Sequence, residues 1–118
     1  MASGNRREEG NQMTYKIRAI VKRPDERYGH MTNVSNKLEN LQKIVGGYIE
    51  VIPGPRGSII ICNEEGKMRG LEPNMPYNGD LLVGTIIVCG TNEENFDDLP
   101  IDLGMAEWKM EVDRQINA

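Results

Sequence analysis

Two apolar runs constrain most strongly what this chain can fold into. Residues 58–62 read SIIIC and residues 81–90 read LLVGTIIVCG, and both are rich in β-branched side chains. A short apolar run bounded by turn residues is typical of a strand that is covered on both faces. The sequence therefore predicts a sheet in which 58–62 is a central strand. Gly84, inside the longer run, predicts a bulge or the close approach of another backbone.

The remaining strands are predicted from alternation. Residues 14–22 place apolar and basic side chains on opposite faces, as in a half-buried strand. Residues 31–34 are expected to add a short strand, and 48–52 another, with a turn at 53–57. Loops are expected at 23–30, at 73–80 and over the acidic residues 91–98.

Two helices are predicted. The first follows Asn36, which we expect to be its N-cap, and ends at Gly46-Gly47 after about nine residues. The second is C-terminal and amphipathic, with one apolar stripe formed by Ile101, Met105, Trp108, Val112 and Ile116. The fold class is α+β: a small, mostly antiparallel sheet of four to five strands, with both helices against one face.

The length of 118 residues supports a single domain, expected at 13–118, after a polar, disordered tail at 1–12. The formal net charge of −4 argues against a protein that coats duplex DNA, since such binding needs many cationic contacts with phosphate. We find neither a run long enough to span a bilayer nor a secretory signal. Cys62 and Cys89 end apolar runs and are expected to be buried thiols in a reducing cytoplasm.

Catalytic groups are scarce. His30 is the single histidine, and we find no serine elbow, P-loop or dinucleotide fingerprint. Glu64 and Glu65 are adjacent, so their carboxylates are expected to point apart. Two cysteines and one histidine without ligand spacing make a zinc site improbable. We therefore expect no enzymatic activity, no cofactor and no metal.

Three stretches carry a resemblance to a known group of proteins: LENLQKIVGGYIEV at 38–51, ICNEEGK at 61–67 and GTIIVCG at 84–90. Over residues 14–100 the chain resembles a "domain of unknown function" family of short proteins from phages, plasmids and other mobile elements of Gram-positive bacteria. That resemblance implies a small cytoplasmic protein without assigned chemistry. In size and class the chain is also similar to phage anti-defence proteins that sequester cyclic ADP-ribose signals.

Candidate contacts lie in two loops and at three cations elsewhere in the chain. The stretch IICNEEGKMRGLEPN at 60–74 predicts a β-turn held by the Asn63 side chain, with Gly66 at positive φ. Alternatively, this turn would place Lys67 and Arg69 against a phosphate or a carboxylate.

The acidic loop offers a second candidate. Phe96 is expected either to pack against the C-terminal helix or to stack on a base, in which case Asn92 would contact polar edges of the ligand. Arg23, Arg56 and Lys109 are expected to supply phosphate contacts if two protomers bring them together.

Two functions stay open. The first is a non-enzymatic, homo-oligomeric binding protein of a mobile element, which captures a nucleotide immune signal such as a cyclic ADP-ribose isomer. The ligand-binding residues would be Arg23, Arg56, Lys67, Arg69, Asn92, Phe96 and Lys109. The second is a protein–protein inhibitor or adaptor without a small-molecule ligand, whose acidic loop at 93–98 engages a basic surface.

Overall fold

The computed structural model describes residues 14–118, so the prediction for the tail at 1–12 lies outside the described residues. The strands are β1 (Lys16–Lys22), β2 (His30–Ser35), β3 (Ile49–Pro53), β4 (Ile59–Asn63), β5 (Pro73–Tyr77), β6 (Asp80–Val83), β7 (Ile86–Asn92) and β8 (Asn95–Asp97). The helices are α2 (Leu38–Val45), the short 3₁₀ helix η1 (Pro55–Gly57) and α3 (Met105–Ile116).

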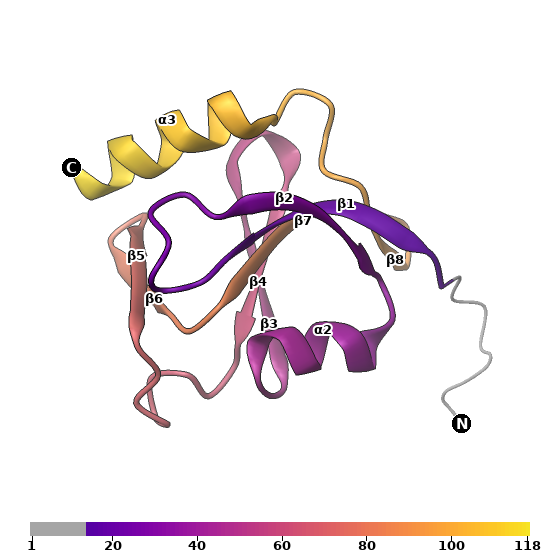
Figure 1. The fold of residues 1–118 in the computed structure, drawn as a ribbon, viewed down its shortest axis with the longest axis horizontal. Coiled ribbons are helices and arrows are strands. Elements are labelled where there is room, and N and C mark those ends of the chain that lie inside the picture. Colours follow the sequence, from indigo (N-terminus) through magenta and orange to yellow (C-terminus); the bar gives the residue numbers. More distant parts are fainter. Residues whose placement is uncertain (1–13) are drawn as a thin grey trace.

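The main sheet is antiparallel, and the α+β class is confirmed (Figure 1). Its strand order is β2-β1-β7-β4-β3, and β8 also pairs with β7, which makes six strands in this sheet. A separate two-stranded sheet is formed by β5 and β6. The strand β4 lies between β7 and β3, so the predicted place of the SIIIC run inside the sheet is confirmed.

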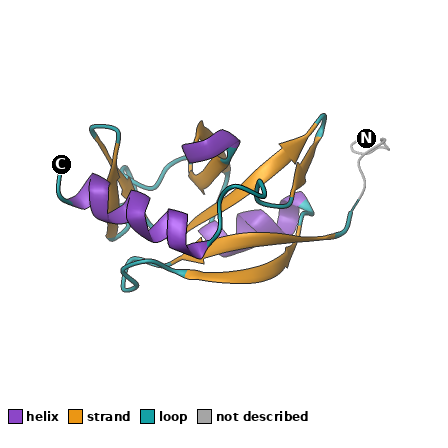
Figure 2. Ribbon diagram, turned by 90° about the horizontal axis from the view of Figure 1, so that it is seen from above, coloured by secondary structure: helices purple, strands orange, loops and turns teal. Residues whose placement is uncertain are grey.

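The two helices cover opposite faces of the sheet, so the expectation that both pack against one face is wrong (Figures 1 and 2). On one face Ile60 and Val88 pack with Trp108 of α3. On the other face Ile61 packs with Leu41 of α2. Neighbouring strand residues point to opposite faces, and β4 and β7 are apolar on both, so each face needs its own cover.

The run at 81–90 is two strands rather than one. Gly84 has a φ of +74°, and a Cβ built there would lie 2.8 Å from Leu71 Cδ1. Its amide donates to the Glu72 carbonyl at 2.7 Å, so the predicted close backbone approach is confirmed. The chain turns at this glycine, so the LLV segment pairs with residues 73–77 in the small sheet. Those residues were expected to be a loop and instead form β5.

The helix ends differ from the prediction in two places. Asn36 does not cap α2, because its Oδ1 accepts from the Tyr15 amide at 2.8 Å and its Nδ2 donates to the Phe96 carbonyl at 3.0 Å. Lys37 takes the cap position without a side-chain bond. The predicted stop is confirmed, since Gly46 adopts a left-handed φ of 87°.

The apolar stripe of the C-terminal helix is only partly buried. Trp108 and Val112 are fully buried, whereas Ile101 precedes α3 and is 94% exposed. Leu99 and Leu103 are buried ahead of the helix instead. This packing fixes α3 across the sheet and leaves one side of the helix to line a groove.

Candidate functional site

The loop after β4 caps the C-terminus of α2. Asn63 Nδ2 donates to the Val45 carbonyl at 3.1 Å, and Arg69 Nη1 donates to the Gly46 carbonyl at 3.0 Å. The last four carbonyls of a helix have no partner within the helix, and these side chains satisfy two acceptors at that end. Asn63 Oδ1 also accepts from the Glu65 amide at 2.8 Å. The VGG and CNEEGKMR stretches are therefore in direct contact and form one structural joint.

The predicted role of Asn63 in holding this turn is confirmed, but two details differ. Gly66 does not have a positive φ. It is sterically required instead, because a Cβ there would lie 2.8 Å from Val83 Cγ2. The turn also joins no hairpin, since β4 pairs with β3 and β7 rather than with β5. Lys67 forms an exposed ion pair with Asp80 of β6. Lys67 and Arg69 thus have structural partners, and their contact with a ligand stays a prediction.

The β7–β8 hairpin contains Asn92 and Phe96, the two ligand contacts predicted in the acidic loop. Asn92 is exposed and pairs across the turn with Asn95. Phe96 is partly buried against the core on the α2 face. The expectation that Phe96 packs on the C-terminal helix is therefore wrong, because α3 lies on the other face of the sheet. Its stacking on a base stays a prediction.

The other predicted cations are also dispersed. Arg23 lies in the β1–β2 loop, where its amide donates to Glu26 Oε1 at 2.8 Å. Lys109 lies on α3 with its Nζ 5.6 Å from the centre of the Tyr28 ring. Within one protomer the seven predicted residues do not converge on one site, and among them only Arg56 lines the groove along α3.

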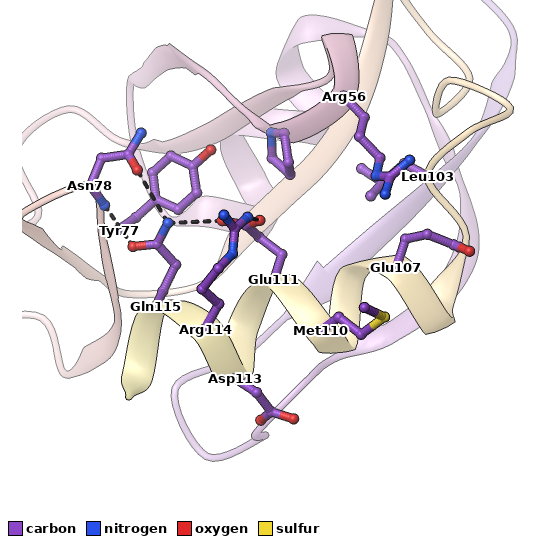
Figure 3. Close-up of a pocket in the computed structure, with 11 residues that line it drawn as sticks. Arg56, Tyr77, Asn78, Leu103, Glu107, Met110, Glu111, Asp113, Arg114 and Gln115 are labelled. Atoms are coloured by element: carbon purple, nitrogen blue, oxygen red, sulfur yellow. Dashed lines mark hydrogen bonds and ion pairs between the residues drawn. The ribbon is translucent and has the colours of Figure 1, made fainter. Parts of the chain in front are cut away.

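This groove, which we call the α3 groove, has a volume of about 780 Å³ (Figure 3). One wall is η1, the second is the turn between β5 and β6, and the third is α3. The lining residues are Pro55, Arg56, Tyr77, Asn78, Leu103, Glu107, Met110, Glu111, Asp113, Arg114 and Gln115.

A polar chain runs along the floor of the α3 groove. Gln115 Nε2 donates to Glu111 Oε2 at 2.8 Å and to Asn78 Oδ1 at 3.1 Å. Its Oε1 accepts from the Asn78 amide at 2.9 Å, so Gln115 joins the helix to the β5–β6 turn. Glu111 is 6% exposed and forms an ion pair with Arg114. A buried carboxylate needs such partners, and here all of them come from the groove itself.

The other carboxylates of the groove also have partners. Glu107 Oε1 accepts from the Gly104 amide at the start of α3, at 3.0 Å. Asp113 points away from the other groove residues in Figure 3. It pairs with Arg27 at 2.9 Å and accepts from the Tyr28 hydroxyl at 2.9 Å. These two contacts hold the pKa of Asp113 below its usual value, the Tyr28 hydroxyl contributing most.

Arg56 is exposed over this groove, and within residues 14–118 its side chain has no hydrogen-bond or ion-pair partner. It lies in the β3–β4 turn, where the Ser58 amide donates to the Pro55 carbonyl at 3.0 Å. Arg56 and Gly57 both have positive φ, 55° and 78°. Turns of this type favour Asn, Asp or Gly at the position of Arg56. The turn alone therefore does not explain an arginine there.

Several groove residues were not expected from the sequence. Arg114 and Gln115 sit among the polar residues of an amphipathic helix, where many positions are simply solvated. Tyr77 and Asn78 were placed in a loop, because a strand with two prolines gives no alternation signal. The Asn78-Gly79 pair was the available signal, since this dipeptide marks a tight hairpin turn.

The single histidine has an acidic partner, and both cysteines are buried. His30 Nδ1 lies 3.0 Å from Glu26 Oε2 in an exposed pair. Cys62 and Cys89 are free and buried, and burial raises their thiol pKa values to about 11 and about 12. Residues 14–118 hold no cluster of metal-ligating side chains. Over the same residues no helix combines the length and apolar character needed to cross a membrane.

Comparison with known proteins places the chain by sequence. The family model described as "Domain of unknown function (DUF3846)" matches residues 17–113. No curated protein and no solved structure is significantly similar to the chain. The matched segment runs from β1 into α3 and includes the contact between α2 and the loop after β4, and it ends at Asp113, before Arg114 and Gln115 of the α3 groove. The chain therefore belongs to the DUF3846 family of domains of unknown function.

Proposed function

We propose that this protein is a non-enzymatic binding protein that holds a small phosphate-bearing, nucleotide-like molecule in the α3 groove. The observation that carries the proposal is the guanidinium of Arg56, which faces the groove without a partner among the described residues. The three carboxylates that line the groove each have a hydrogen-bond or ion-pair partner. The free guanidinium of Arg56 is the group that would contact an anionic ligand.

The chemistry of the groove suits a phosphate with further polar groups. A guanidinium offers a planar fork of donors that matches a phosphate, and it stays charged at any physiological pH. Asn78 Nδ2 is a second donor without a partner among the described residues, and it comes from the facing wall. A volume of about 780 Å³ is in the range of small-molecule sites.

The biological role is the broader part of the proposal. We infer that the ligand is a nucleotide immune signal, such as a cyclic ADP-ribose isomer, and that its capture by a homo-oligomeric phage or mobile-element protein inhibits host defence. Two observations support this role: the resemblance of the chain to small proteins of phages and mobile elements, and the unpaired guanidinium of Arg56 in the groove. The proposed site contains Arg56, which was predicted from the sequence, together with Asn78, Arg114 and Gln115, which were not.

The test is ligand-dependent stability. Thermal unfolding would be followed with pyrophosphate, cyclic ADP-ribose isomers and cyclic dinucleotides, and the affinity of any hit measured by calorimetry. A ligand at a hundredfold excess over its dissociation constant should stabilise the fold by about 2.7 kcal/mol. The informative variant is Arg56→Asn, because asparagine suits the turn and keeps the fold while removing the guanidinium.

We expect Arg56→Asn to lose the ligand shift and Arg23→Asn, at an exposed position outside the groove, to keep it. No stabilisation by any ligand of the panel would refute the proposal and leave the adaptor function. A ligand shift that survives Arg56→Asn unchanged would refute the assigned site.

A further inference from the structure

We propose that the free edge of β3, together with the acidic groove beside it, binds an extended cationic segment of another protein as an added β-strand. This site is separate from the α3 groove. The two grooves have no lining residue in common. The site is independent of the nucleotide-binding proposal.

The backbone of β3 is open on its outer edge. β3 is the last strand in the sheet order and pairs only with β4. The Glu64 amide donates to the Tyr48 carbonyl, and the Gly54 amide donates to the Ser58 carbonyl, so alternate residues from Tyr48 face β4. In an antiparallel pair the residues between them face outward. The amides and carbonyls of Ile49 and Val51 therefore point away from the sheet.

These outward groups are free to bond an incoming strand. None of the hydrogen bonds among the described residues uses them. Val51 is 43% exposed, so the edge is open to solvent. Extended peptides add to such edges through main-chain hydrogen bonds and gain specificity from alternate side chains. Pro53 has no amide and limits the free edge to a short stretch.

The groove next to this edge supplies the specificity. It has a volume of about 470 Å³ and is formed by β3, β4, β6 and the loop after β4. The residues that line it are Glu50, Ile52, Cys62, Asn63, Glu64, Glu65, Lys67, Met68, Asp80, Leu81, Leu82 and Val83. They include four carboxylates and a single cation, and that cation, Lys67, is already paired with Asp80.

The negative charge of this groove favours a cationic partner. The carboxylates of Glu50, Glu64 and Glu65 have no partner among residues 14–118. Burial is the main cause of the raised pKa of the Cys62 thiol, and the negative charges of Glu50 and Asp80 raise it further. A lysine or arginine side chain fits here, because its stem can lie on exposed Met68 and Leu81 while its head reaches a carboxylate.

A second copy of this chain suits the edge less well. Antiparallel pairing of two β3 edges about Val51 would place the Glu50 side chains of both copies on the same face of the sheet as diagonal neighbours, within reach of each other. Two like charges in this arrangement repel. Pro53 would also leave the Ile49 carbonyl of each partner without a donor. Charge and hydrogen bonding therefore both favour a cationic partner over self-association.

The test uses two labelled synthetic peptides of about nine residues, one alternating lysine with valine and one alternating glutamate with valine. Fluorescence anisotropy should show binding of the cationic peptide only, and higher salt should weaken it. The variant Glu50→Lys/Glu64→Lys should bind at least about tenfold more weakly. Asp25→Lys/Glu39→Lys makes the same change in net charge at exposed positions outside both grooves and should bind like the wild type.

A third variant tests the strand pairing itself. Val51→Pro removes an outward amide without touching the bonds to β4, and it should abolish binding. The proposal is overturned if neither peptide binds, if the anionic peptide binds equally, or if both charge reversals have the same effect. A dimer that depends on the β3 edge would overturn it in favour of a second copy. If Val51→Pro does not fold, the proposal is still tested by comparing how the two charge-reversed variants bind the cationic peptide.

Discussion

Removing the Asn63 side chain should cost a large share of the stability of this domain. The residue is 5% exposed and makes two hydrogen bonds, to the Val45 carbonyl at 3.1 Å and from the Glu65 amide at 2.8 Å. Each bond contributes about 1 kcal/mol net, and a buried polar group left without a partner costs ~1–3 kcal/mol. Asn63→Ala should therefore lower the free energy of unfolding by about 2–4 kcal/mol.

Urea unfolding followed by tryptophan fluorescence measures this loss, since Trp108 is the single tryptophan and is fully buried. With a slope of about 1–3 kcal/mol per molar urea, the midpoint should fall by at least ~0.7 M. Asn33→Ala is the matched control, because the Asn33 side chain is exposed and has no partner among the described residues; the midpoint of this variant should not move. A midpoint for Asn63→Ala that matches this control would refute the capping role of the loop.

Three further predictions concern the core. Burial lowers the pKa of the Lys22 amine. Between this pKa and 10.5 the unfolded chain binds more protons than the folded chain, so the free energy of unfolding should rise with pH. Urea titrations at several pH values should show this rise in the wild type and not in Lys22→Met. The Cys62 and Cys89 thiols, with pKa values raised to about 11 and about 12, should react with a disulfide reagent at neutral pH only as fast as the protein unfolds, and faster labelling would contradict their burial. Gly90→Ala should lower the unfolding midpoint by more than any other change proposed here, because the added Cβ would lie 2.2 Å from the Asp98 carbonyl oxygen. An unchanged midpoint would contradict the register of β7 and β8.

The fold class followed from patterns that have one simple meaning. An apolar run such as 58–62 is covered on both faces in the structure, and Gly46 ends α2 as predicted. The predictions that were wrong rested on patterns that are compatible with two different structures. Asn36 has the chemistry of a helix cap, yet its side chain bonds Tyr15, just before β1, and Phe96 of β8, both far from it in sequence. Residues 73–77 form a strand despite two prolines, because β6 lies beside them.

The candidate site was only partly accessible from the sequence. Arg56 stood out as a cation in a turn between two strands, and it lines the α3 groove. Arg114 and Gln115 gave no such signal, because their place beside Asn78 depends on how α3 crosses the β5–β6 turn. Lys67 looked free in the sequence and is paired with Asp80 in the structure. Side-chain partners distant in the chain are set by packing rather than by local pattern.

A titration of nitrogen-labelled protein with pyrophosphate, and then with the best nucleotide of the panel, tests the α3 groove most directly. The amide NMR signals of Arg56, Gly57, Asn78 and Gln115 should shift together and saturate, while those of the loop at 64–69 should not move. In Arg56→Asn the signals of Gly57, Asn78 and Gln115 should stay in place at equal ligand concentration. Saturable shifts confined to other parts of the molecule, or no shifts with any ligand, would contradict a phosphate-binding site in this groove.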